Sequence, residues 1–240
     1  MSLPLFYSPV IPGVGELLEL EEENAKHIVQ VLRKTTGDEV RLTDGKGTIS
    51  QCAITASAKK SCTVRIQSIT NVPPPLHKVT IAISLLKNAG RFEWFLEKAA
   101  ETGIHAIVPL ICQRTERQVF RESRLKSILA SAMLQSQQSW ITEIAAPMPF
   151  PSFIASLKQP SFDRQYIAHC EDDAKRELST MIDREQRSSL ILIGPEGDFT
   201  PEEIIAAIAA GCIPVQLGET RLRSETAGIT AAILLRQLGG

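Results

Sequence analysis

Three consecutive prolines, Pro73-Pro74-Pro75, divide this chain of 240 residues into two parts with different patterns. A proline fixes its own φ and cannot donate a backbone hydrogen bond. Such a run therefore joins neither a helix nor a central strand and favours an extended connector. We predict two domains, residues 1–72 and residues 73–240, and the 43% apolar content is sufficient for a globular core.

Short β-type runs fill most of the part before the prolines. They cover residues 40–43, 48–54 and 62–69, separated by Asp44-Gly45-Lys46-Gly47 and by residues 56–61. One helix is predicted over residues 24–33, because Ile28, Val31 and Leu32 have the spacing of a single helix face. These patterns predict a small, mostly β barrel or sandwich.

After the prolines, strand patterns alternate with helix patterns. The predicted strands are 79–86, 104–110, 166–170, 190–193 and 213–217. The predicted helices include 121–138, 174–184, 201–210 and one that carries Phe92, Phe95, Leu96 and Ala99 as an apolar stripe. This alternation predicts an α/β domain with a mostly parallel sheet.

The segment 190–203 runs from a buried strand through a glycine loop into a helix. Thr200 and Glu203 have the spacing of a capping box, and Pro201 suits the first helical position. Gly194 and Gly197 allow a ligand to approach the backbone at the carboxyl end of the strand. On composition alone, a tight turn that binds nothing is an equal alternative.

The segment 215–228 repeats this order of strand, glycine loop and helix, with Ser224 or Thr226 as the candidate cap. Two such loops at the ends of neighbouring strands would form the crevice in which open α/β sheets bind ligands. Arg221, Arg223 and Glu225 crowd the second loop. They are either solvent-facing charges or catalytic groups.

Several functional classes are excluded by what the sequence lacks. No dinucleotide or P-loop glycine motif, serine-hydrolase elbow or metal-binding histidine spacing occurs, and the five cysteines are scattered, so we expect no metal. No run reaches the roughly 18 apolar residues of a membrane span, which predicts a soluble, cytoplasmic protein. The net charge of −1 means that any RNA site must be a local basic patch.

The motifs Ile193-Gly-Pro-Glu-Gly197 and Leu217-Gly-x-x-x-Leu-Arg-x-Glu-Thr-Ala227 resemble the SPOUT methyltransferases, and most closely the RsmE family. The segments 27–33 and 44–47 resemble that family's N-terminal domain. The resemblance implies an α/β fold, with a C-terminal SPOUT trefoil-knot domain preceded by a small PUA-like β-barrel domain. It also implies methylation of N3 of a uridine in 16S rRNA of the small ribosomal subunit, by a homodimer.

The resemblance further implies S-adenosyl-L-methionine as the cofactor. The expected cofactor-binding residues are Ile193, Gly194, Glu196, Gly197, Leu217, Gly218 and Leu222. For catalysis, Arg223 is expected to stabilise the uridine anion, while Glu225 orients it or serves as the base. The expected RNA-binding residues are Arg33, Arg114 and Arg117.

Two other functions remain open: a SPOUT methyltransferase that acts on tRNA, and a non-catalytic RNA-binding assembly factor. The sequence also departs from the family pattern. The segment 134–138 lacks the charged residues that the family tends to have, and Leu5 stands in place of an arginine. Asp198 follows Gly197 where many relatives have a second glycine, a substitution that a turn accepts because aspartate tolerates unusual φ.

Overall fold

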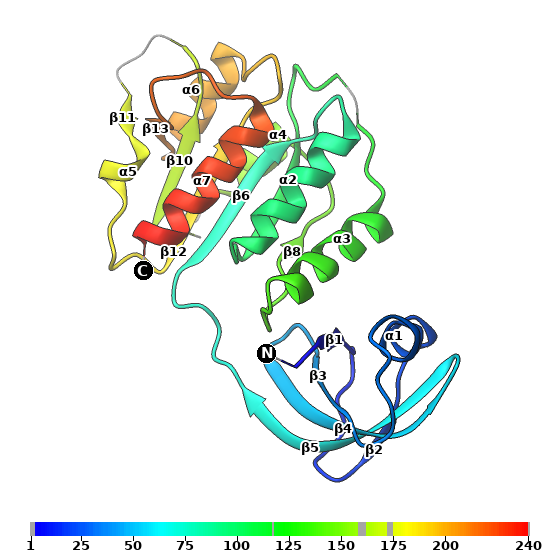
Figure 1. Ribbon diagram of the computed structural model, residues 1–240. Helices are drawn as coiled ribbons and strands as arrows, with labels where there is room; N and C mark the ends of the chain where they lie inside the picture. The colour runs from blue at the N-terminus through cyan, green and yellow to red at the C-terminus, as the bar shows by residue number, and fades with distance from the viewer. Residues whose placement is uncertain (1–2, 117, 158–161, 172–174, 240) are drawn as a thin grey trace. The chain divides into compact units, whose positions relative to one another are not determined.

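The computed structural model describes residues 3–116, 118–157, 162–171 and 175–239. The chain forms two compact units, which are Met1–Pro74 with Met133–Ile141, and Pro75–Ala132 with Thr142–Gly240. Figure 1 shows the elements of each unit. The proline run lies where the first unit ends and the second begins.

Trp140 is one of the residues that link the segment Met133–Ile141 to the first unit. The indole Nε1 donates to the carbonyl oxygen of Val72 at 3.1 Å, and Trp140 also forms an isolated β-bridge with Lys46. The aromatic ring leaves no room for a side chain at Gly47, where an added Cβ would lie 2.5 Å from the ring. No local sequence pattern indicated this contact.

A five-stranded sheet, in the order β1-β3-β4-β5-β2, forms most of the first unit. Its strands are β1 (Leu5–Tyr7), β2 (Leu17–Glu19), β3 (Glu39–Thr43), β4 (Thr48–Ala58) and β5 (Ser61–Asn71). β4 and β5 form a hairpin that pairs as far as Ala58 and Ser61. The break predicted at residues 56–61 is therefore present but shorter, and consists of the turn at Lys59 and Lys60. The alternation fades there because residues 56–58 at the end of β4 are exposed.

The predicted helix over residues 24–33 has two parts, α1 (Glu22–Lys26) and the π-helical η1 (His27–Val31). Ile28 is fully buried in the core of this unit, but Val31 is 67% exposed. A π-helical turn takes more residues than an α-helical turn, so the i, i+3 spacing no longer keeps both side chains on one face. Arg33 follows with a φ of 54°, in the left-handed region.

The second unit is built on a parallel sheet in the order β11-β13-β10-β12-β6-β7-β8, with β9 on β7. Its strands are β6 (Lys78–Ser84), β7 (Ala106–Ile111), β8 (Glu143–Ile144), β9 (Met148–Pro149), β10 (Arg164–Ala168), β11 (Arg176–Glu177), β12 (Ser188–Ile193) and β13 (Ile213–Gln216). The prediction of an α/β domain with a mostly parallel sheet is confirmed.

The helices are α2 (Ala89–Glu101), α3 (Glu122–Gln135), α4 (Phe150–Ser156), α5 (Leu178–Met181), α6 (Pro201–Ala209) and α7 (Ser224–Leu238). The helix predicted over 174–184 is wrong within the described residues, because β11 and the short α5 occupy that stretch. Among the described helices, none combines the length and apolar character that crossing a membrane requires.

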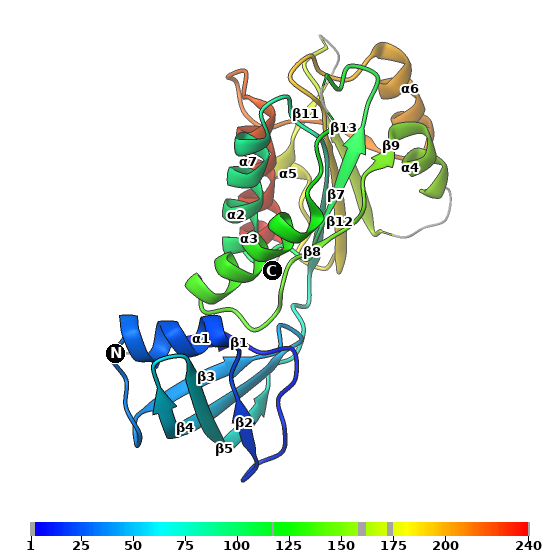
Figure 2. The same cartoon turned by 90° about the vertical axis from the view of Figure 1, so that its right-hand side faces the viewer.

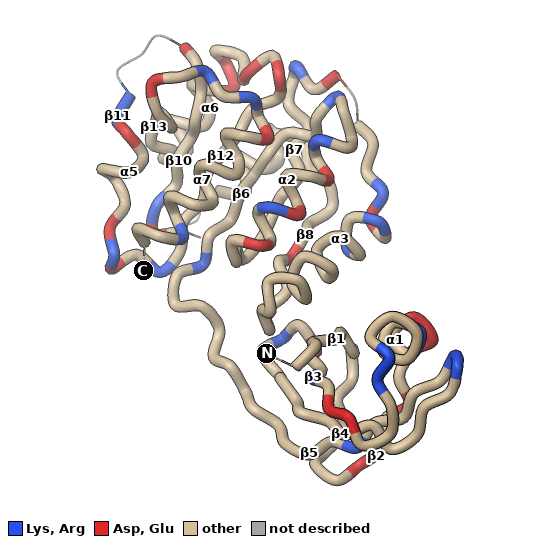
Figure 3. The backbone as a smooth tube through the Cα atoms, in the orientation of Figure 1, with Lys and Arg blue, Asp and Glu red and all other residues tan. Residues whose placement is uncertain are grey.

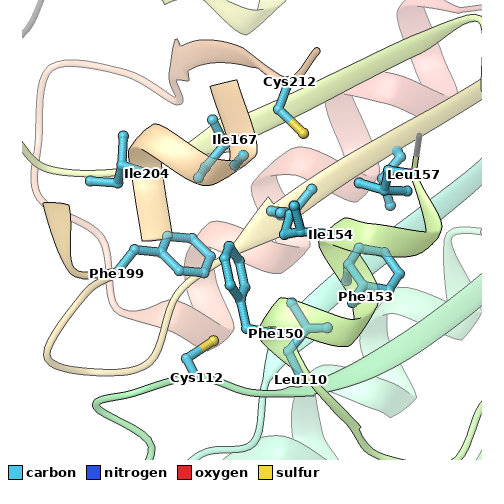
Figure 4. Packing of buried hydrophobic residues seen from close by; sticks show 14 residues of the cluster. Leu110, Cys112, Phe150, Phe153, Ile154, Leu157, Ile167, Phe199, Ile204 and Cys212 are labelled. Carbon is cyan, nitrogen blue, oxygen red and sulfur yellow. The ribbon is translucent and has the colours of Figure 1, made fainter. Parts of the chain in front are cut away.

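Helices cover both faces of the parallel sheet. Figure 2 shows α2, α3 and α7 on one face, and α4 and α6 on the other. The core under α4 and α6 contains Phe150, Phe153, Ile154, Phe199 and Ile204 (Figure 4). The rings of Phe150 and Phe199 lie with their centroids 5.4 Å apart. This core supports the loop that leads from β12 into α6.

On the opposite face, α7 approaches α2 closely at Gly228. A Cβ added at Gly228 would lie 2.5 Å from Cε2 of Phe95 and 3.3 Å from Cδ1 of Ile83. Glycine normally weakens a helix interior. Here it allows the buried ring of Phe95 to pack directly against the helix backbone.

The strand order corrects one expectation. The two glycine loops follow β12 and β13. The prediction that these strands are neighbours is wrong, because β10 lies between them and pairs with both. A strand's sequence does not specify its position in a parallel sheet, because the connecting helices permit several orders. The carboxyl end of β10 is therefore part of the same crevice.

Lowering the pH below about 6.5 is expected to reduce the stability of the second unit. His77 is buried, with Nε2 2.7 Å from Oγ of Ser189, and burial, followed by the nearby charge of Arg236, lowers its pKa below the ordinary 6.5. The unfolded chain then binds a proton more readily than the folded chain. Stability that is present above pH 6.5 is lost as the pH falls.

Melting temperatures measured between about pH 8 and pH 5 test this expectation. His77→Gln removes the titrating group and should make the decline shallower. Part of the decline should persist, because burial also lowers the pKa of His105. A decline in His77→Gln as steep as in the unsubstituted protein would exclude His77 as its source.

Candidate functional site

The β12–α6 loop has the predicted local structure. Thr200 is the N-cap of α6, where its side chain accepts a hydrogen bond from the Glu203 backbone N–H at 3.3 Å. The Glu203 carboxylate accepts from the Thr200 N–H at 2.9 Å. The predicted capping box is confirmed, and the fully buried Phe199 anchors the loop in the core beside it.

Polar contacts hold the β12–α6 loop against the ends of neighbouring strands. Three of these contacts are hydrogen bonds from backbone N–H groups to carboxylates. Glu196 Oε1 accepts from the Lys87 N–H at 3.0 Å, and Asp198 Oδ2 accepts from the Cys170 N–H at 2.7 Å. Glu203 Oε1 accepts from the Gln113 N–H at 2.8 Å. Arg114 adds a fourth contact by donating Nη1 to the Gly197 carbonyl at 2.7 Å. The loop is therefore linked to the segments that follow β6, β7 and β10.

The β13–α7 loop enters its helix differently. Arg223 is the N-cap residue of α7, with an extended ψ of 155°, and its side chain makes no cap hydrogen bond. The expectation that Ser224 or Thr226 caps this helix is wrong, because both residues already lie within α7. The Arg223 side chain is left exposed at the end of the loop.

A cavity of about 590 Å³ lies at the carboxyl ends of β10, β12 and β13. Residues 168–170, 193–196 and 215–224 supply most of its lining, with Lys175, Asp198 and Ala227. Both glycine loops predicted from the sequence therefore border one cavity. Its volume falls within the roughly 300–1,000 Å³ typical of small-molecule and cofactor sites.

Most of the predicted cofactor residues line this cavity: Ile193, Gly194, Glu196, Leu217, Gly218 and Leu222. Arg223, predicted to be catalytic, also lines it. Gly197 does not, and a Cβ added there would lie 3.4 Å from Cδ of Arg114. The open side of Gly197 therefore faces the Arg114 side chain.

Glu225 occupies the first turn of α7 but is not part of the cavity lining. Its side chain is buried, and Oε1 lies 3.7 Å from Nε of Arg91 on α2. The second oxygen, Oε2, is buried and forms no hydrogen bond with the described residues. The structure therefore pairs Glu225 with Arg91, and the catalytic role of Glu225 stays a prediction.

The predicted RNA-binding residues lie in separate places. Arg33 is exposed at the end of η1 in the first unit. Arg114 is exposed in the second unit, but its Nη1 donates to the Gly197 and Phe199 carbonyls at 2.7 Å and 3.3 Å. Arg117 lies outside the described residues. The contacts of Arg114 indicate support of the β12–α6 loop, and its RNA role remains untested.

Four further residues line the cavity that the sequence patterns did not indicate as site residues: His169, Cys170, Lys175 and Asp198. His169 and Cys170 follow the last residue of β10, so the rule that ligands bind at the carboxyl ends of parallel strands would have included them. Lys175 donates to the His169 carbonyl at 2.9 Å and so holds this end of the cavity together.

Charged residues of both signs line the cavity. Figure 3 marks where lysine, arginine, aspartate and glutamate residues lie along the backbone. Lys175, Arg221 and Arg223 contribute positive charge. Glu196, Asp198 and Glu219 contribute negative charge. Over the part of the chain that the structure describes, no cluster of three His, Cys, Asp or Glu side chains could hold a metal ion. The lining suits a ligand that carries both a positive and a negative charge and that lies close to backbone groups of the loops.

A parallel α/β sheet with a cavity at the carboxyl ends of its strands, preceded by a small β domain, defines a two-domain α/β protein that binds a small ligand. Residues 72–236 match the family described as RNA methyltransferase domain, and residues 20–67 match the RNA methyltransferase PUA domain. The chain belongs to this RNA methyltransferase family.

Similar proteins agree with this assignment. Ribosomal RNA small subunit methyltransferase E of Bacillus subtilis is 29% identical over 87% of this chain and 85% of its own length. The crystal structure of a probable rRNA-methyltransferase from Porphyromonas gingivalis has a TM-score of 0.88 and 36% identity, and covers 99% of this chain and 98% of that chain.

The methyltransferase E of Neisseria gonorrhoeae was solved bound to S-adenosyl methionine. It has a TM-score of 0.85 and 27% identity, with 99% of this chain and 98% of that chain covered. These comparisons confirm the predicted RsmE resemblance and the fold class, a PUA-like domain followed by a SPOUT domain.

Proposed function

We propose that this chain transfers a methyl group from S-adenosylmethionine to N3 of a uridine in 16S rRNA of the small ribosomal subunit. The observation that carries the proposal is the single cavity that both glycine loops border. The names of the similar proteins, ribosomal RNA small subunit methyltransferase E, support the substrate.

The residues of the cavity suit this cofactor. When bound, S-adenosylmethionine supplies an electrophilic methyl group. Gly194 lines the cavity. The tight turn needs a glycine there, because an added Cβ would lie 3.0 Å from the Phe199 nitrogen. Leu217 and Leu222 offer apolar surface in the opposite loop, and the charges of both signs match those of the cofactor.

Methylation at N3 requires removal of the N3 proton and leaves negative charge on the uracil ring. Arg223 suits this charge, because it lines the cavity and its guanidinium pairs with no described residue. We propose that Glu225, held by Arg91, orients the uridine or accepts the proton. As a base, Glu225 would need the substrate to reach its buried carboxylate.

We propose that the N-terminal domain, residues 1–72, binds RNA, with Arg33 as one contact. Nη1 of Arg114 already donates to the carbonyls of Gly197 and Phe199. A phosphate of the RNA at Arg114 would therefore contact the other N–H groups of the guanidinium. Arg117 is proposed from sequence alone. A limited set of basic contacts agrees with the net charge of −1, which disfavours indiscriminate RNA binding.

We also propose that the protein is a cytoplasmic homodimer. Trp94 on α2 and Ile233 on α7 are 48% and 38% exposed, and these two helices pack together. Large apolar side chains exposed on adjoining helices favour an interface. A second copy of the chain would cover them.

The test is to incubate small ribosomal subunits from a strain without this methylation with labelled S-adenosylmethionine and the purified protein. We expect 3-methyluridine in 16S rRNA, located by nuclease mapping and mass spectrometry. Light scattering of the same protein should give about twice the chain mass of 26.3 kDa.

The two alternatives give different outcomes. Label found only on tRNA would identify a tRNA methyltransferase. An RNA-binding assembly factor would bind ribosomal subunits and transfer no label at all.

A further inference from the structure

The carboxylate of Asp198 joins two loops that border the cavity. Oδ1 accepts a hydrogen bond from the Phe199 backbone N–H at 2.8 Å, and Oδ2 accepts from the Cys170 backbone N–H at 2.7 Å. Asp198 follows β12, whereas Cys170 follows β10. One side chain therefore links the carboxyl ends of two adjacent strands.

The backbone at Asp198 is also unusual. Its φ is 63°, in the left-handed region that glycine, asparagine and aspartate adopt most readily. Its N–H donates to the Pro195 carbonyl at 2.9 Å and closes the turn. Glycine would keep this turn but would supply no carboxylate. The link to Cys170 thus depends on the aspartate of this chain.

We propose that Asp198 is a positioning residue for the cofactor, which fixes the backbone of residues 169–170 as the middle wall of the cavity. β10 lies between β12 and β13, so this wall separates the two glycine loops. A wall that is ordered before binding reduces the entropy lost when the ligand binds. The inference rests on the proposed function, because it takes the ligand to be S-adenosylmethionine.

The chemistry of the carboxylate allows a sharp substitution series. The two N–H donors contact different oxygens of Asp198, and an amide keeps only one of these oxygens as an acceptor. Asp198→Asn keeps the size and the backbone preference but loses one acceptor, and Asp198→Gly loses both. Hydrogen bonds to a charged group are strong enough that we expect the Kd for S-adenosylmethionine to rise roughly tenfold in Asp198→Asn, and more in Asp198→Gly.

Calorimetric titration of the full chain with S-adenosylmethionine measures this effect. Glu171→Gln is the matched control, because Glu171 is an exposed carboxylate beside Cys170 that lies outside the cavity lining. Its Kd should stay within about twofold of the unsubstituted protein. In Asp198→Asn, the KM for S-adenosylmethionine should rise, while kcat and the KM for rRNA stay unchanged.

Cys170 provides a readout that does not depend on activity. It is exposed, whereas Cys52, Cys62, Cys112 and Cys212 are buried. Iodoacetamide should therefore alkylate Cys170 first, and S-adenosylmethionine in the cavity should slow the reaction. At the same cofactor concentration, protection should be weaker in Asp198→Asn.

Unchanged affinity and unchanged protection in Asp198→Asn would overturn the inference. An equal loss of affinity in Glu171→Gln would also overturn it, because removal of charge alone would then explain the effect. If Asp198→Gly does not fold, Asp198→Asn decides the question. Failure of the unsubstituted protein to bind S-adenosylmethionine would instead refute the proposed function, so the two failures are distinguishable.

Discussion

Arg223→Ala is expected to lower kcat about 10²- to 10³-fold, with the affinity for S-adenosylmethionine changed by no more than roughly threefold. Arg223 lines the cavity, and its guanidinium pairs with no described residue, so its charge is available to the substrate. Negative charge on the uracil ring develops mainly in the transition state. Loss of Arg223 should therefore reduce turnover more than binding. Single-turnover methylation of small ribosomal subunits measures the rate, and calorimetry measures the affinity.

Arg221→Ala is the matched control, because Arg221 has the same charge, lies in the same loop and also borders the cavity. Its effect on kcat should be much smaller if one guanidinium acts on the uridine. Arg223→Lys should give an intermediate rate, since it keeps the charge but loses the planar fork of donors. Equal losses in Arg221→Ala and Arg223→Ala would mean that only the total charge matters. Full activity of Arg223→Ala would remove Arg223 from the mechanism.

Phe199→Ala is expected to destabilise the second unit by about 3–5 kcal/mol. Phe199 is fully buried, packs against Phe150 and lies in the core shown in Figure 4. Removal of its ring leaves a cavity that the surrounding helices and strands fill only partly. The melting temperature should fall by roughly 6–20 °C. Differential scanning calorimetry measures both quantities.

Two further variants show whether the loss of stability comes from removing a buried side chain or from removing any apolar side chain. Phe199→Leu keeps much of the volume and should cost less than Phe199→Ala. Ile205→Ala, on α6, removes a side chain that is 67% exposed and should change stability by no more than about 0.5 kcal/mol. If Phe199→Ala is as stable as Ile205→Ala, Phe199 does not anchor the β12–α6 loop.

Local patterns predicted the parts of this protein that depend on neighbouring residues. The capping box at Thr200 and Glu203 formed as expected, since both partners lie within one helical turn. The apolar strand at 190–193 and the helix at 201–210 are present with nearly the predicted limits. Most of the cofactor-binding residues that the family motifs predicted in the two glycine loops also line the cavity.

Other features depend on residues that are distant in the sequence. The sequence did not indicate that β10 separates the two glycine loops, so His169 and Cys170 were missed. It also did not indicate that Nη1 of Arg114 donates to the Gly197 carbonyl. RNA binding by Arg114 stays a prediction.

The physical reason is the range of the interactions. Helix caps and apolar periodicity are specified within a few residues of chain, so the sequence determined them by itself. The order of parallel strands and the contacts of a long side chain are decided only when the whole domain packs. The tertiary structure therefore decided that Asp198 reaches Cys170, that Glu225 pairs with Arg91, and which loops share the cavity.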